Sequence, residues 1–205
     1  MLEAIVAMGI IVTAVSSALS LVIMAVKAEK DSETTIVAVN LAREGIEAVR
    51  AIRDSNWLAG KAYDSGLKTI PPLSDDDCTA IPFFDVNSTG QANGYWSLDF
   101  GPDALLPVYR YTSGPNIGLM FQYNGAPPSS PAPWSQSGFN RLVTVNFSCR
   151  VKSAEPSGRS LVAVPKCPCP SDEEFVGLWV KSEVRWSSSG RPKQITLEEK
   201  LFDWR

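Results

Sequence analysis

Histidine is absent from this chain of 205 residues. Because histidine is the commonest general base and a frequent metal ligand, its absence argues against an enzyme and against a metal centre. The GxGxxG, Walker A and GxSxG patterns are also absent. The formal net charge is −3, so no excess of basic residues indicates a nucleic-acid partner. We therefore expect neither catalysis nor a cofactor.

Charge and proline are both missing from the start of the chain. Glu3 is the only charged residue between Met1 and Val26, and no proline occurs between Met1 and Ile70. As an α-helix, the stretch from Ala4 to Val26 would span roughly 35 Å, which is enough to cross the hydrocarbon core of a bilayer. No Lys or Arg precedes the apolar run, whereas a secretory signal peptide normally begins with a basic region. We expect that a leader has already been removed.

The apolar run passes without a helix stop into an amphipathic stretch. Apolar or small residues recur there three or four positions apart, as in a helix with one buried face: Leu41, Gly45, Ile46, Val49 and Ile52. We expect one helix from near residue 1 to about Trp57, wholly apolar in its first half and amphipathic in its second. Its apolar stripe should pack on a β-sheet, where the candidate partners are Trp179, Val184 and Ile195.

The remainder of the chain has the pattern of an all-β head with long loops. Little periodicity is visible from Leu58 to about Gly90, and a Pro/Ser/Gly-rich loop is expected at 125–138. Strands are expected at 95–100, 107–112, 119–124, 141–151, 176–186 and 193–204. The last two flank the turn sequence SSSGRP and should form a long hairpin. The expected fold class is α+β, with a long N-terminal helix packed on a C-terminal antiparallel sheet.

The segment MLEAIVAMGIIVTAVSSAL resembles the start of type IV pilins and type II secretion pseudopilins. Mature chains of that family open with a short apolar stretch, then a glutamate, then a long apolar run. The continuation AREGIEAVRAIRDSNWL resembles the second half of the helix in many prepilin-type proteins, and the final hairpin resembles their C-terminal strand pair. The family glutamate is the fifth residue of the mature chain, whereas Glu3 is the third here. Either two residues belong before this stretch or the mature end is atypical.

In that family the glutamate is understood to neutralise the methylated terminal amine, usually of a neighbouring subunit. The resemblance implies this assembly role for Glu3. The physics agrees, because a carboxylate in an apolar helical bundle needs a cation, and an α-amino group is the nearest candidate. The alternative is that Glu3 is solvated at a membrane interface and the helix is a plain anchor.

The four cysteines, Cys78, Cys149, Cys167 and Cys169, are expected to form two disulfides in an exported head. A bridge within the Cys-Pro-Cys stretch would close a very short loop, so we favour pairs that join Cys167 and Cys169 to Cys78 and Cys149 in either combination. A zinc site is the rival hypothesis, but the spacing lacks the usual paired C-x2-4-C pattern. Calcium binding by Asp75, Asp76 and Asp77 is less favoured than a solvated acidic turn.

These patterns and the resemblance predict three parts. Residues 1–26 form an apolar helix that is a membrane anchor before assembly and a filament core afterwards. Residues 27–58 are its amphipathic continuation, and residues 59–205 form a disulfide-stabilised β head. The expected function is structural, as a subunit of an extracellular type IV pilus-like filament serving adhesion or surface motility. The expected partners are other copies of the chain, further pilus assembly components and, before assembly, the inner or cytoplasmic membrane. The alternative is a membrane-anchored extracellular binding domain that works as a monomer.

Overall fold

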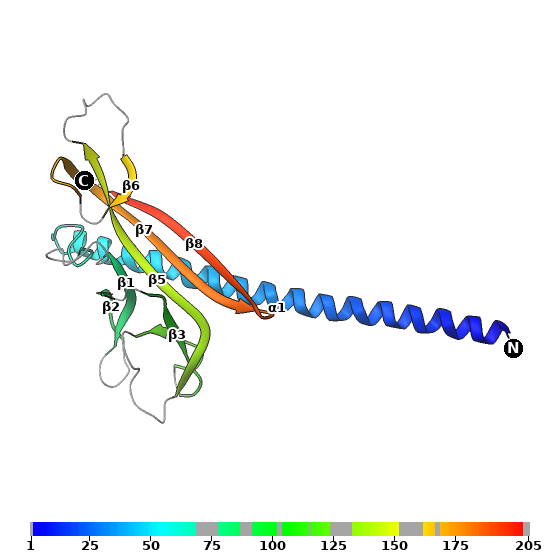
Figure 1. Cartoon of the computed structure of the whole chain (residues 1–205). Helices are drawn as coiled ribbons and strands as arrows, with labels where there is room; N and C mark the ends of the chain where they lie inside the picture. The colour runs from blue at the N-terminus through cyan, green and yellow to red at the C-terminus, as the bar shows by residue number, and fades with distance from the viewer. Residues whose placement is uncertain are drawn as a thin grey trace.

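The computed structural model describes residues 2–68, 78–86, 92–101, 104–114, 116–123, 133–151, 162–166 and 169–202. One long helix is followed by strands that all belong to one antiparallel sheet, which confirms the expected α+β class (Figure 1). Three features discussed from the sequence lie outside the described residues: the acidic turn at 75–77, Cys167 and most of the Pro/Ser/Gly-rich loop.

The helix α1 (Leu2–Leu58) is uninterrupted, in agreement with the expected span. No proline removes a backbone donor within it, so nothing forces a break. Every residue from Leu2 to Lys30 is exposed, and the first buried residue is Ala38. In Figure 1 the blue half of α1 projects beyond the sheet, while the rest of the helix lies along it. We call Leu2–Lys30 the bare half of α1 and Asp31–Leu58 the packed half.

The sheet is organised around the long strand β5 (Trp134–Val151), which uses both of its edges. One edge pairs with β7 (Glu173–Ser188), and β7 pairs in turn with β8 (Arg191–Phe202). The other edge of β5 is shared by three strands, β3 (Leu106–Tyr111), β1 (Thr79–Val86) and β6 (Val162–Lys166). The outer strands are β4 (Met120–Gln122), paired with β3, and β2 (Ala92–Phe100), paired with β1.

The strands β7 and β8 form the expected long hairpin. Ser188 pairs with Arg191, which leaves Ser189 and Gly190 as a two-residue turn. Both turn residues have positive φ, 52° and 75° respectively, as the twist-matched type I′ turn requires. Glycine adopts this conformation freely, whereas in serine it is sterically unfavourable because of the Cβ atom. The tip of the hairpin lies beside α1 at Asp31, where the bare half ends and the packed half begins (Figure 1).

Two apolar clusters hold the packed half of α1 on one face of the sheet. One joins Ile46 and Val49 of the helix to valines and leucines of β5, β7 and β8, and the other joins Ala38 and Leu41 to residues of β3, β5 and β7, Val184 among them. Ile52 and Ile195 are partly buried against these clusters, so this part of the expected interface is confirmed. Each such aliphatic side chain contributes about 1.5–3 kcal/mol when fully buried.

Trp179 does not face α1, and this expectation was wrong. The even-numbered residues from Leu178 to Val184 are the buried ones, so Trp179 points to the opposite face of the sheet. There its Nε1 donates to Glu198 Oε2 over 3.2 Å, and Lys200 Nζ lies 4.4 Å from the ring centroid. Trp179 and Val184 are separated by an odd number of positions, so a strand cannot present both side chains to the same helix.

The strands β1 and β6 and the first residues of β5 were not anticipated. β1 lies in a region expected to lack regular structure, and it contains Pro82, which normally argues against a central strand. Pro82 is tolerated because only Thr79 and Ala80 pair with β5, while Pro82 pairs with Leu98 of β2 alone. β5 begins inside the expected loop at 125–138, since its polar first residues gain hydrogen-bonded partners from β3.

Cys149 and Cys169 form a disulfide with a Cα–Cα distance of 5.8 Å. Cys169 thus reaches one of the two partners that the sequence favoured, and the bond ties the approach to β7 onto β5. Cys78 is disulfide-bonded as well. Sulfur atoms in disulfides are not thiolates, so these three cysteines do not provide the zinc site considered above.

Candidate assembly site on helix α1

The bare half of α1 presents an apolar surface on all sides. Its exposed large apolar residues are Leu2, Ile5, Val6, Met8, Ile10, Ile11, Val12, Val15, Leu19, Leu21, Val22, Ile23, Met24 and Val26. By length and composition α1 could cross a membrane, a test that a signal sequence near the N-terminus would also pass. The core helix of a soluble protein would pass it too, but such a helix is mostly buried, and none of the most apolar part of α1 is buried. The described residues of the chain leave this apolar surface uncovered, and contiguous apolar surfaces of this kind typically mark sites of contact with proteins or membranes.

The polar side chains of the bare half are compatible with an apolar cover. Each hydroxyl donates to a carbonyl in the preceding turn: Thr13 to Ile10 O over 2.9 Å, Ser16 to Val12 O and Ser17 to Thr13 O over 2.8 Å, and Ser20 to Ser16 O over 3.0 Å. A hydroxyl transferred to apolar surroundings is costly only when it lacks a hydrogen bond. These hydroxyls therefore do not oppose burial among lipids or neighbouring helices.

Glu3 lies exposed in the first turn of α1. An acidic residue there is favoured by the partial positive charge of the helix N-terminus, typically by 0.3–1 kcal/mol. Among the described residues, the structure records no ion pair or hydrogen bond for its carboxylate. Within an apolar environment the helix terminus alone would not compensate such a charge. Within the described part of the chain, Glu3 is therefore exposed and has no recorded counter-charge.

The packed half contains Gly45 at the closest approach of α1 to the sheet. A Cβ atom built on Gly45 would lie 2.5 Å from Ser182 Oγ on β7 and 3.0 Å from Val143 Cγ2 on β5. Ser182 is fully buried, and its hydroxyl has no hydrogen-bond partner in the described part of the chain. By contrast, a Cβ on Gly9 in the bare half would meet nothing within 4 Å. Gly45 is therefore packed against the sheet, whereas Gly9 has open space in which another helix could pack.

A buried arginine fixes the packed half along its axis. Arg141 of β5 is 1% exposed and donates through Nη1 to Leu41 O over 3.1 Å and to Glu44 Oε1 over 3.0 Å. Its Nε donates to Gln122 Oε1 over 2.7 Å, and Gln122 Nε2 donates back to Arg141 O over 2.8 Å. Burial lowers the pKa of Arg141, and the carboxylate of Glu44 opposes this shift. The network sets which turn of α1 lies over which residues of β5.

A second polar contact lies nearer the end of the helix. Arg50 Nη2 donates to both carboxylate oxygens of Glu199 on β8, over 2.5 and 2.6 Å, and Nη1 donates to Glu47 over 2.6 Å. The hydrogen bonds from Arg50 to Glu199 raise the pKa of Arg50 above its usual value. The pair is about one-third exposed, so solvent screens it and its contribution to stability is small.

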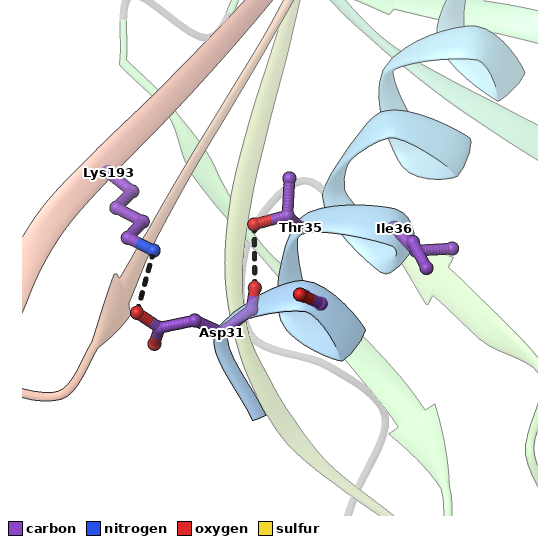
Figure 2. Close-up of a pocket in the computed structure, with 5 residues that line it drawn as sticks. Asp31, Thr35, Ile36 and Lys193 are labelled. Carbon is purple, nitrogen blue, oxygen red and sulfur yellow. Dashed lines mark hydrogen bonds and ion pairs between the residues drawn. The ribbon is translucent and has the colours of Figure 1, made fainter. Parts of the chain in front are cut away.

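The third polar contact is at the boundary between the two halves of α1. Asp31 accepts a hydrogen bond from Ser188 Oγ and a longer one, 3.5 Å, from Ser189 Oγ, and its Oδ2 lies 3.2 Å from Lys193 Nζ. Figure 2 shows Lys193 reaching from β8 to Asp31 beside a shallow open pocket that Thr35 and Ile36 also line. We call Asp31, Ser188, Ser189 and Lys193 the tip clasp.

Sequence reasoning identified Glu3 and the apolar stripe but missed Arg141 and the tip clasp. The available signal was the apolar character of residues 139, 143 and 145, which share the parity of Arg141 in an alternating strand and are buried in the structure. No local signal links Asp31 to Lys193, which is far away in the chain. Only the length of the hairpin, combined with the direction of α1, brings them together.

An aromatic cluster lies on β3, β4 and the start of β5. Tyr109 and Phe121 stack with ring centroids 5.6 Å apart, and Trp134 meets Tyr109 edge-on at 5.0 Å. Leu119 and Tyr123 nearby are exposed. In the part of the chain that the structure describes, no group of three or more His, Cys, Asp or Glu residues could hold a metal ion. The described part of the head thus carries exposed apolar side chains, among them Leu119 and Tyr123, close in sequence to the aromatic cluster.

No protein-family model, no curated protein and no solved structure matches this chain.

Proposed function

We propose that this protein is a structural subunit of an extracellular type IV pilus-like filament and assembles through the bare half of α1. The observation that carries the proposal is an apolar helical surface, Leu2–Val26, which is exposed on every side and extends from a folded head. Neither water nor the head can cover it favourably. A membrane would cover it before assembly, and the same helices of other copies would cover it afterwards.

Exposure of the bare half to water is strongly unfavourable. Burying an apolar side chain of this size contributes about 1.5–3 kcal/mol relative to water. Leaving the membrane for a bundle of helices gives no such gain, so contacts between helices must replace those with lipid tails. Gly9, with open space around it, and the internally bonded serines would allow helices to approach closely. The bare half thus has the features that helix association in apolar surroundings requires.

In this proposal Glu3 selects the position at which a subunit docks. Its carboxylate would pair with the terminal amine of another copy, since a charge among apolar helices needs a counter-charge. The packed half, held by two apolar clusters and by Arg141, would transmit that position to the head. The heads would form the outer surface of the filament and would serve adhesion or surface motility.

The test is electron microscopy of material sheared from producing cells, with mass spectrometry of its components. We expect thin filaments in which this chain is the main protein. Glu3→Ala should lower the filament yield about tenfold or more, because an amine left unpaired among apolar helices is strongly unfavourable. The matched control is Glu29→Ala, which removes another exposed helical carboxylate beyond the apolar run and should leave the yield unchanged. A normal yield from Glu3→Ala with a folded head would contradict the assembly role of Glu3.

A membrane-anchored binding domain is the second candidate. The exposed Leu119 and Tyr123 beside the aromatic cluster favour it, because such residues often mark contact surfaces. This candidate predicts that the chain remains in the membrane fraction and that no sheared filament contains it. Retention of this kind would overturn the filament proposal.

A further inference from the structure

The tip clasp is the outermost contact of the head with α1. Every residue from Leu2 to Lys30 is exposed, and Asp31 is the first whose side chain meets the sheet. Thr34 and Thr35 are half-buried, and the apolar clusters begin at Val37 and Ala38. Val37 and Ala38 lie about 9–11 Å further along the axis than Asp31, at 1.5 Å per residue. Between them and Asp31 no residue joins the buried clusters of the described chain.

The helix is intrinsically weak between these two contacts. Ser32, Thr34 and Thr35 lie there, and all three have lower helix propensity than alanine or leucine. Their hydroxyls donate to carbonyls of the preceding turn: Ser32 to Ala28 O over 2.9 Å, Thr34 to Lys30 O over 3.2 Å and to Asp31 O over 3.1 Å, and Thr35 to Asp31 O over 2.7 Å. Such bonds compete with the backbone ladder and often bend helices. Figure 2 shows the bond of Thr35 beside the tip clasp.

We propose that the tip clasp locks a hinge in α1 between Asp31 and Val37. When the clasp is closed, the β7–β8 turn braces the weak segment from the side, and the bare half extends in line with the packed half. When the clasp is open, the head holds α1 only from Val37 onward, and the bare half changes direction relative to the head. This inference rests on the fold of the single chain and does not depend on filament formation.

The composition of the clasp suits a lock that opens. Its contacts all converge on one carboxylate, whose side chain is 37% exposed, and the Lys193 side chain is 33% exposed. Exposed pairs of this kind are weak and sensitive to salt. The two apolar clusters and the buried Arg141 do not share these properties, so the clasp would open while the rest of the interface remains closed. A change of direction at this point would let one subunit fit both a membrane and a second apolar environment.

The experiment is hydrogen exchange by mass spectrometry on the full chain in detergent micelles, which cover the bare half without any filament. Asp31→Ala should accelerate exchange of the amides from Ser32 to Val37 and of the β7–β8 turn about five- to tenfold, because several hydrogen bonds to one charged group are lost. The matched control is Glu33→Ala, which removes a carboxylate of the same helical turn whose one recorded partner among the described residues is Lys30, at 3.0 Å. It should leave the turn at the wild-type rate.

Two further readouts separate a hinge from general destabilisation. Lys193→Met should produce the same local acceleration as Asp31→Ala, more weakly, because it removes the ion pair and keeps the bonds from the serines. Amides of β5 and β7 around Val143 and Val180 should keep their protection in every variant. Equal exchange in Asp31→Ala and Glu33→Ala would overturn the proposal. Loss of protection throughout the sheet would overturn it as well, because the clasp would then support the whole head.

Discussion

The two halves of α1 have similar lengths and opposite surroundings. From Leu2 to Lys30 every residue is exposed, whereas Ala38, Ala42, Ala48 and Val49 in the packed half are completely buried. The half with the more apolar sequence is the exposed one. Within a single globular chain this inverts the usual relation between hydrophobicity and burial. The amphipathic half of α1 therefore stabilises the fold through its buried side chains, whereas the apolar half, Leu2–Lys30, has no buried residue.

Arg141→Ala should have the largest effect on stability and should show how strongly the packed half is fixed. The substitution leaves Glu44, Gln122 and the Leu41 carbonyl without their buried donor, at an expected cost of about 3–5 kcal/mol. The measurement is chemical denaturation of the full chain in micelles. Arg150→Ala is the control, because its pair with Glu174 is more than half exposed and is worth only about 0–1 kcal/mol. Equal effects of the two variants would show that the buried network does not hold the helix.

The two helical glycines give a direct comparison of the halves. Gly45→Ala should destabilise the protein by about 1–2 kcal/mol, since overpacking against Ser182 and Val143 exceeds the gain in helix propensity. Gly9→Ala should not lower the free energy of unfolding, because nothing lies within 4 Å of the added methyl group. Adding Ser182→Ala to Gly45→Ala should restore part of the loss by removing the closest atom. A destabilising Gly9→Ala in the isolated chain would break the comparison.

The smallest expected effect is a pH-dependent change in stability that comes from Asp31, at the boundary between the two halves of α1. The bond from Ser188, followed by that from Lys193, lowers the pKa of Asp31 below its ordinary value of 3.8. A carboxyl group with a depressed folded-state pKa stabilises the fold above the unfolded-state value, and this contribution is lost as the pH falls through the folded-state pKa. The melting temperature of the wild type should therefore be slightly higher than that of Asp31→Ala at pH 5. This difference should disappear well below pH 3.8. A difference that persists unchanged in strong acid would contradict this assignment.

The fold class and the helix could be predicted because their signals are local. The absence of proline and the spacing of Leu41, Ile46 and Val49 define a continuous helix and its buried face. The hairpin could be predicted from the two strand patterns that flank SSSGRP, a stretch in which the structure places the two-residue turn at Ser189 and Gly190. The strand β1 could not be predicted, because Pro82 is allowed only through the limited pairing of β1 with β5.

The residues of the candidate site also differ in whether local sequence signals could identify them. The sequence identified Glu3 as the single charge in an apolar run, although its proposed role in assembly remains to be tested. It did not identify Arg141, whose network needs three separate segments, or Asp31, whose partners come from the tip of a hairpin far along the chain. Contacts of this kind depend on register and direction, which no local pattern encodes.

Helical periodicity and composition are properties of neighbouring residues, so the first half of the helix could be recognised from the chain alone as apolar on all sides and the second half as apolar on one side. The point at which the exposed half of α1 ends depends on the tertiary structure. This boundary lies at Asp31, and it is set by how far the β7–β8 hairpin extends along α1. The tertiary structure also decided which side of the sheet faces the helix, since the register of β7 on β5 buries Val184 and turns Trp179 away.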